Sequence, residues 1–140
     1  MHRLYLVVTH FEWHGRQMNE IVYLSMDPAR ARDFADSIPP SELEQQITIE
    51  ESEVEGEYIG EPFVYGVIRM IYYPNHLDNK QENFKYTFDE NQAVDYAENL
   101  FADSNNIPRS ILVKVSKIRL DEYIEEGIVN EETSIEFERD

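Results

Sequence analysis

The stretch Asp27 to Ile38, DPARARDFADSI, recurs 62 positions later as Asp89 to Leu100, DENQAVDYAENL. Seven of the twelve aligned positions agree in identity or in close chemistry. In both copies the apolar residues fall at i, i+3, i+4 and i+7, which is the spacing of one face of an α-helix. The sequence therefore predicts two related helices, near residues 28–38 and 90–101.

Both helix starts carry capping residues. Asp27 and Asp89 stand where an N-cap belongs, because a short side-chain oxygen can accept a hydrogen bond from the free amides of the first turn. Pro28 suits the first helical position, and Gln92, three residues after Asp89, completes the pattern of a capping box.

The segments around each helix favour β-strands. A hairpin is predicted before each helix and one strand after it, which gives a ββαβ unit used twice. The expected strands are 4–11, 21–26 and 46–51 in the first unit and 64–73, 84–88 and 110–118 in the second. The joint between the units is Glu61-Pro62. The residues 134–137 either add an edge strand or belong to a frayed acidic tail.

The predicted fold class is α+β: two ββαβ repeats packed as one pseudo-symmetric domain with antiparallel sheet and two helices. A half-chain of this size is marginally stable alone, so the two units are expected to share a core. The expected organisation is a first repeat at 1–62, a second repeat at 63–128 and an acidic C-terminal segment at 129–140.

The pattern of core positions resembles a class of short, uncharacterised bacterial and phage domains built as hairpin, helix and strand. It is carried by an apolar strand such as LYLVV (residues 4–8) followed by YLSMDPARARDFA (residues 23–35), and it covers roughly residues 3–125. The resemblance implies the tandem fold and contains no catalytic signature.

Composition narrows the classes of function. The chain has 140 residues, no cysteine, and 17 aromatic side chains that argue against disorder despite a net charge of −17. Thiol chemistry and cysteine-bound zinc are excluded, and no apolar stretch is long enough to span a membrane. The charge opposes direct binding of nucleic acid or anionic lipid. We expect a cytoplasmic protein.

The net charge is concentrated in two segments. Residues 33–68 contain ten acidic and no basic side chains, and residues 121–140 contain nine acidic residues and one Arg. The rest of the chain is nearly neutral. Because each segment includes the stretch after the third strand of a unit, the two are partly equivalent.

The candidate binding residues lie in these segments. If the run 51–57 is extended, Glu51, Glu53, Glu55 and Glu57 line one side at about 6.6 Å spacing, comparable to the spacing of DNA phosphates. The alternative interpretation is a solvated edge strand whose like charges prevent aggregation. The full predicted set is Glu50, Glu51, Glu53, Glu55, Glu57, Tyr58, Glu61, Asp121, Glu122, Glu125 and Glu126.

A metal site is the less favoured alternative. His10, Glu12 and His14 alternate, so a regular strand would place them on one face, and two His with a carboxylate can bind a divalent ion. Trp13 and Gly15 indicate that the strand ends there. Nucleotide-binding loops, EF-hand loops and nucleophile elbows are absent from the sequence. We predict no cofactor, no metal and no catalytic residues.

The sequence favours a non-enzymatic acidic module that occupies a basic, nucleic-acid-handling surface of a partner protein. Small acidic inhibitors made by phages and mobile elements, including DNA mimics, are similar in size and charge. Two alternatives remain open: an immunity or antitoxin protein that covers a basic toxin, and a small structural protein whose acidity serves solubility. A third, less favoured alternative is a metal-dependent hydrolase that uses His10 and His14.

Overall fold

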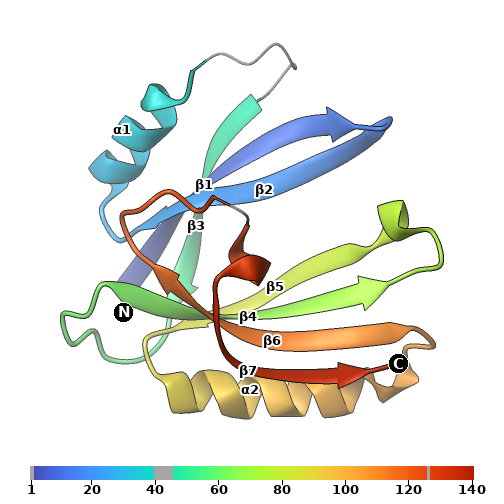
Figure 1. The fold of residues 1–140 in the computed structure, drawn as a ribbon. Helices are drawn as coiled ribbons and strands as arrows, with labels where there is room; N and C mark the ends of the chain where they lie inside the picture. The colour runs from blue at the N-terminus through green and yellow to red at the C-terminus, as the bar shows by residue number, and fades with distance from the viewer. Residues whose placement is uncertain (1, 40–45, 126) are drawn as a thin grey trace.

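The computed structural model of the chain describes residues 2–39, 46–125 and 127–140 (Figure 1). The first half contains β1 (His2–Trp13), β2 (Arg16–Ser25), α1 (Pro28–Ser37) and β3 (Gln46–Val54). The second half contains β4 (Phe63–Tyr72), β5 (Lys80–Thr87), α2 (Glu90–Asp103) and β6 (Ser110–Arg119). A further strand, β7 (Glu132–Arg139), follows. The expected α+β class with two helices is confirmed, and residues 134–137 belong to a strand.

The strands form two antiparallel sheets. The first sheet has the order β2-β1-β3 and the second has the order β5-β4-β6-β7. All the strand pairings within these sheets are antiparallel. The central strand β1 is therefore flanked by its hairpin partner on one side and by the strand after α1 on the other.

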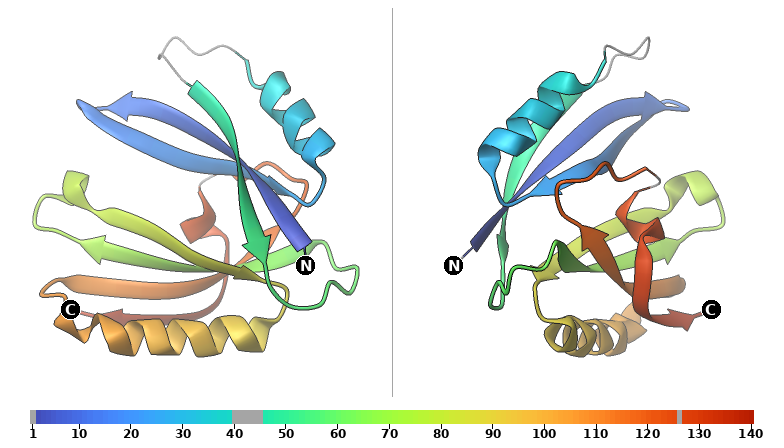
Figure 2. Two further views of the ribbon diagram at one scale, coloured as in Figure 1. Left: turned by 180° about the vertical axis from the view of Figure 1, so that it is seen from behind. Right: turned by 60° about the vertical axis from the view of Figure 1, so that its left-hand side comes forward.

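The sheets and helices stack as four layers, with α1 over the outer face of the first sheet and α2 over the outer face of the second (Figures 1 and 2). Apolar side chains from both halves fill the space between the sheets, including Leu6, Leu24, Ile68 and Ile118. Burial of apolar surface is the main driving force for folding, so this shared core holds the halves together.

Two small sets of backbone hydrogen bonds join the sheets at their edges. Glu55, just after β3, donates to the Tyr86 carbonyl at 3.0 Å and accepts from the Phe88 amide at 2.9 Å. On the other side, the Asp121 and Ile124 amides each donate to carbonyls of β2 at 2.8 Å. The segments after β3 and after β6 therefore pair with the opposite sheet.

The structure confirms the predicted N-caps of both helices and corrects one predicted capping contact. Asp27 accepts a hydrogen bond from the Ala29 amide at 2.9 Å, and Asp89 accepts one from the Asn91 amide at 2.9 Å. The capping-box role of Gln92 is wrong, because the Asp89 amide donates to Thr87 Oγ1 at 3.1 Å instead. The preceding strand thus supplies the second acceptor that a capping box would have supplied.

In the part of the chain that the structure describes, neither helix has the length and apolar character needed to cross a membrane.

Candidate functional site

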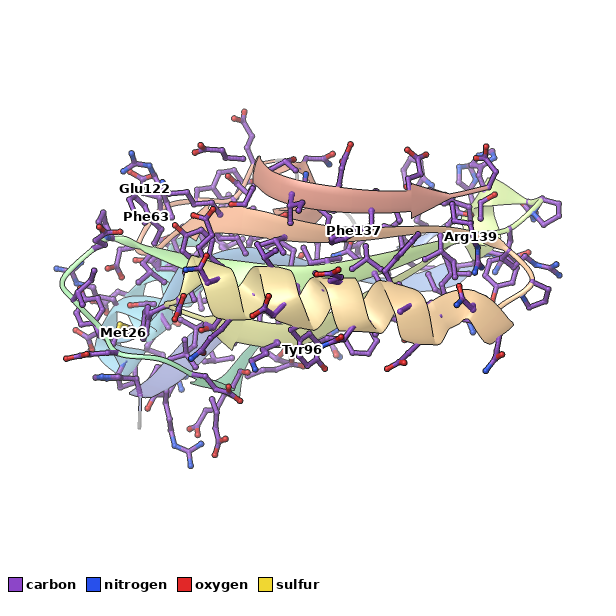
Figure 3. All side chains as sticks on the ribbon, turned by 90° about the horizontal axis from the view of Figure 1, so that it is seen from below. Met26, Phe63, Tyr96, Glu122, Phe137 and Arg139 are labelled. Atoms are coloured by element: carbon purple, nitrogen blue, oxygen red, sulfur yellow. The ribbon has the colours of Figure 1, made fainter. Side chains whose placement is uncertain are left out.

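The two acidic segments meet at one end of the molecule. The Leu120 amide, at the end of β6, donates to the Pro62 carbonyl at 2.8 Å, which fixes the β3–β4 connection beside the segment that follows β6. A hollow of about 370 Å³ opens between them. It is lined by Ser25, Met26, Asp27, Arg30, Tyr58, Pro62, Leu120 and Asp121. We call this region, formed by residues 55–62 and 120–125, the acidic end; Figure 3 shows Met26 and Glu122 there, far from Arg139.

The predicted run of four alternating carboxylates is only partly regular. Glu50, Glu51 and Glu53 lie exposed on the edge strand β3, with Glu51 and Glu53 on the face that packs against α1. Glu51 forms an ion pair with Arg3 at 3.3 Å. β3 ends at Val54, and Gly56 has a φ of +89°, so the strand geometry that would align Glu57 with the others stops there.

The remaining residues of the first acidic segment have separate environments. Glu55 forms an ion pair of 2.8 Å with Lys85. Glu57 and Glu61 are exposed in the β3–β4 connection, and neither has a side-chain partner among the described residues. Their carboxylates are therefore exposed to solvent.

Two apolar side chains stand between these free carboxylates. Tyr58 is 39% exposed and its ring contacts Phe88, with 5.2 Å between the ring centroids. Ile59 is 71% exposed. Exposed apolar groups surrounded by charges are typical of the centre and rim of protein interfaces.

Asp121, by contrast, has side-chain partners within the protein. Its Oδ1 accepts a hydrogen bond of 2.6 Å from the Ser25 hydroxyl, and its Oδ2 lies 3.3 Å from Arg30 Nη1. The Ser25 oxygen in turn accepts from the Asp27 amide at 3.0 Å. Burial raises the pKa of the nearby Tyr23 hydroxyl, and the negative charge of Asp121 raises it further. The Asp121 side chain therefore joins β2 and the start of α1 to the segment after β6.

The other residues of the second acidic segment differ in their contacts. Glu122 lies 3.9 Å from Arg119, both exposed, which is a weak interaction in water. Glu125 is exposed and has no side-chain partner in the described residues. Glu126 lies outside the residues that the structure describes.

Tyr123 was missed by the sequence interpretation. It is 61% exposed and stacks on Phe34 at 6.1 Å. A signal for it is present in the sequence, because Glu57-Tyr58-Ile59 recurs as Glu122-Tyr123-Ile124 at the corresponding place after β6. The two copies differ in burial, since Ile124 is almost fully buried and Ile59 is exposed.

The proposed metal ligands have other contacts. The His10 ring nitrogens are hydrogen-bonded to Asn19 Oδ1 at 2.6 Å and to Thr48 Oγ1 at 2.7 Å. His14 lies in the β1–β2 turn with a φ of 50°. Within residues 2–39, 46–125 and 127–140, no three His, Asp or Glu side chains are grouped so that they could hold a metal ion. The hydrolase alternative thus has no such group to build on in this part of the chain.

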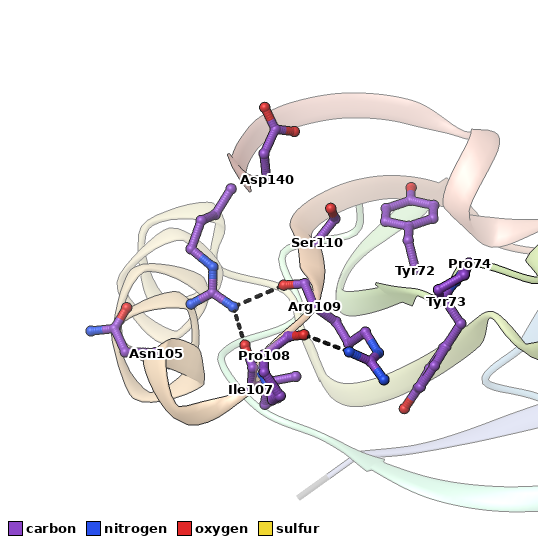
Figure 4. Close-up of a pocket in the computed structure, with 10 residues that line it drawn as sticks. Tyr72, Tyr73, Pro74, Asn105, Ile107, Pro108, Arg109, Ser110 and Asp140 are labelled. Carbon is purple, nitrogen blue, oxygen red and sulfur yellow. Dashed lines mark hydrogen bonds between the residues drawn. The ribbon is translucent and has the colours of Figure 1, made fainter.

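The opposite end of the molecule presents Arg109 and Arg139 beside Asp140. A hollow of about 800 Å³ lies there between the β4–β5 connection and the start of β6, with Tyr73, Pro108 and Arg109 in its walls (Figure 4). Arg139 donates to the carbonyls of Ser104, Ile107 and Arg109 at 3.1, 2.5 and 3.0 Å, so it holds the end of β7 to the loop before β6. Arg109 stacks on the Tyr73 ring.

In comparisons with protein-family models, with curated proteins and with solved structures, none matches this chain.

Proposed function

We propose that this protein is a non-enzymatic acidic module that binds a partner protein by occupying a basic, nucleic-acid-handling surface. The observation that carries the proposal is the acidic end, where the exposed side chains Tyr58, Ile59 and Tyr123 lie in the same two remote segments as the free carboxylates. Charge alone gives attraction without specificity, whereas charge around exposed apolar anchors gives both.

The binding would be competitive with nucleic acid. Glu57, Glu61 and Glu125 would take the places of phosphates in the basic groove, and the net charge of −17 would raise the association rate through long-range attraction. Tyr58 and Ile59 would then enter an apolar depression of the partner and slow dissociation. The affinity should fall as salt is added, because exposed charges are screened.

A tandem repeat of ββαβ units with pseudo-twofold symmetry is part of this proposal, and so is the resemblance to the short bacterial and phage domains. The register of β1 with β2 shifts between Val7 and Val8, and that of β4 with β5 shifts between Val67 and Ile68. Tyr23 pairs with Val7 at the first shift, and Lys85 pairs with Val67 at the second. Tyr23 and Lys85 are 62 positions apart, which is also the separation of the two N-cap aspartates. β-bulges are specific features of a sheet, so their equivalent placement supports one unit used twice.

The experiment uses capture from a host lysate at low salt, with elution by salt up to about 0.5 M. A protein captured in this way is purified, and its affinity is measured for the wild type and for the triple variant Glu57→Gln, Glu61→Gln, Glu125→Gln. The matched control removes three exposed carboxylates of α2: Asp95→Asn, Glu98→Gln, Asp103→Asn. We expect the acidic-end variant to bind at least about tenfold more weakly, a loss of about 1.4 kcal/mol, and the control to bind nearly normally.

Competition with duplex DNA identifies the surface that is bound. If the proposal holds, DNA and this protein exclude each other from the partner. A partner whose toxic enzymatic site is covered instead, without competition from DNA, would favour the immunity or antitoxin alternative. If both triple variants weaken partner binding equally, the better explanation of the acidic residues is that they serve solubility. A cytoplasmic location is proposed with the function, because proteins that handle nucleic acid act there.

A further inference from the structure

A third cavity lies between the tips of the two hairpins. Its volume is about 410 Å³, which is within the range of small-molecule sites. One wall comes from the β1–β2 hairpin and the other from the β4–β5 hairpin. The tips of these two hairpins lie on the same side of the molecule (Figure 1). Arg16 and Asp78 form an ion pair between the two hairpins. The lining residues are Trp13, Arg16, Gln17, Met18, Asn19, Met70, His76, Asn79 and Gln81.

Four side-chain amides line this cavity, and two of them are held in position. Asn19 Oδ1 is bonded to the His10 ring at 2.6 Å, and Asn79 Oδ1 accepts from the Tyr73 amide at 2.8 Å. Because each carbonyl oxygen is used in this way, the NH₂ groups of Asn19 and Asn79 remain as fixed donors. Gln17 and Gln81 are exposed and have no side-chain partner among the described residues. They add adjustable donors and acceptors.

The apolar part of the lining is exposed to solvent. Trp13 is 51% exposed and Met18 is 38% exposed, and Met70 adds a partly buried side chain. The turn that presents Trp13 is tight, because His14 and Gly15 have positive φ values of 50° and 76°, as in a type I′ hairpin. A large indole ring on a rigid turn offers a flat contact surface without a large entropy cost.

The charge of the lining defines the ligand class. Among the residues that the structure describes, no carboxylate lines the cavity. Its basic side chains are Arg16, which is paired with Asp78, and His76. An anionic ligand would be repelled by the net charge of −17. A purely apolar ligand would cover the NH₂ groups of Asn19 and Asn79 and the amides of Gln17 and Gln81 without giving them hydrogen bonds, at a cost of about 1–3 kcal/mol for each group so covered. The ligand that fits is neutral, with apolar faces and many hydroxyl groups, since hydroxyls both donate and accept as amides do.

We propose that the cavity between the two hairpins binds a neutral saccharide, with one sugar ring against Trp13 and its hydroxyl groups bonded to the amides of Asn19, Asn79, Gln17 and Gln81. This site is separate from the acidic end and does not depend on the function proposed there. A protein with both sites would bind a basic partner at one end and a glycan between its hairpins.

The test uses the fact that Trp13 is the only tryptophan in the chain. Its fluorescence therefore reports directly on this cavity. The full-length protein is titrated with maltose, cellobiose and N,N′-diacetylchitobiose up to about 10 mM. We expect a saturable change in Trp13 emission for at least one of them, with a Kd of about 1 mM or below.

Two variants test whether the saccharide binds in this cavity. Gln17→Ala and Gln81→Ala remove exposed amides and should each weaken saccharide binding at least threefold without changing the thermal midpoint. The matched control, Gln46→Ala, removes an exposed amide of β3 outside the lining and should bind as the wild type does. Adenosine, a neutral ligand with a flat aromatic face, is titrated in parallel.

A flat emission curve for all three disaccharides would overturn the saccharide proposal. Saturable binding of adenosine in their place would also overturn it. Equal weakening by Gln46→Ala and by the two cavity variants would also overturn it, because the binding would then lie elsewhere.

Discussion

The Ser25 hydroxyl donates a hydrogen bond of 2.6 Å to Asp121 Oδ1, and the two residues are 96 positions apart in the chain. Ser25 ends β2, whereas Asp121 follows β6, so this bond connects the two halves of the protein. The same Ser25 oxygen accepts from the Asp27 amide at the start of α1. The acidic end therefore contains one carboxylate that stabilises the fold and several that are free to bind.

Replacement of Asp121 should destabilise the fold. Asp121→Ala removes the acceptor for Ser25 and places alanine at a φ of 61°, which only glycine, asparagine and aspartate adopt readily. We expect a loss of about 1–3 kcal/mol in the free energy of unfolding, measured in urea. Asp121→Asn keeps an acceptor and tolerates this φ, so its loss should be smaller. Equal stability of the wild type and the alanine variant would contradict the role assigned to this bond.

The two copies of the Glu-Tyr-Ile sequence should respond oppositely to truncation. Ile124→Ala empties a place in the core between the sheets and should cost about 2–5 kcal/mol of stability. Ile59→Ala removes an exposed side chain and should leave the thermal midpoint unchanged while weakening partner binding. Thermal unfolding and binding assays on the same two variants separate the effects. A destabilised Ile59→Ala protein would show that Ile59 is needed for folding.

Gly66 should not tolerate a side chain. A Cβ atom there would lie 3.0 Å from Ile118 Cδ1 and 3.3 Å from Tyr86 Cε1, so the ring of Tyr86 lies across the place that a side chain would fill. Gly66→Ala should destabilise the protein by about 1–3 kcal/mol through overpacking of the core. Chemical denaturation measures this loss. The double variant Tyr86→Leu, Gly66→Ala should recover part of the stability that Gly66→Ala loses. If the double variant recovers none of it, the loss comes from the strand backbone.

Tyr86 should make stability fall at alkaline pH. Burial raises the pKa of its hydroxyl, and the charge of Glu50 adds to the rise. Between the unfolded pKa of about 10 and the higher folded value, the unfolded state loses the proton first, so unfolding becomes easier by up to about 1.4 kcal/mol per pH unit for this group. Tyr86→Phe should reduce this slope, measured by urea denaturation from neutral pH to about pH 11.

The same variant is informative at neutral pH. The Tyr86 hydroxyl has no hydrogen-bond partner among the described residues, so its removal should leave stability unchanged or slightly increased. A clear loss of stability at pH 7 in Tyr86→Phe would reveal a hydrogen bond to this hydroxyl, for example from a buried water molecule.

The run of carboxylates on and after β3 provides a test of charge. Replacing Glu51, Glu53, Glu55 and Glu57 with Gln removes two ion pairs, an exposed one to Arg3 and one to the partly buried Lys85, each of which contributes about 1 kcal/mol or less. The fold should survive, since repulsion within the run is removed as well. Partner binding should weaken at low salt and depend less on salt concentration. Unchanged affinity across the salt series, with the fold intact, would move the binding surface to the segment after β6.

The sequence by itself determined the local elements. The positions of both helices, their aspartate caps and the six expected strands follow from residue spacing and from side-chain chemistry, which act between near neighbours in the chain. The first hairpin extends further than the expected strands 4–11 and 21–26: β1 and β2 reach to Trp13 and Arg16, because a tight turn at His14 and Gly15 continues the hairpin. The concentration of charge in two segments was also readable from composition alone.

Only the tertiary structure decided which residues meet. The pairing of β3 with β5 through Glu55, and of β2 with the segment after β6, is set by how the two sheets close over their shared core. That packing buries Ile124 and exposes Ile59, although both follow the same two residues. It also brings Asp121 into contact with Ser25 and Arg30, whereas Glu57, Glu61 and Glu125 form no such contacts with the described residues. Long-range packing balances burial over the whole domain, and no local pattern of residues contains that information.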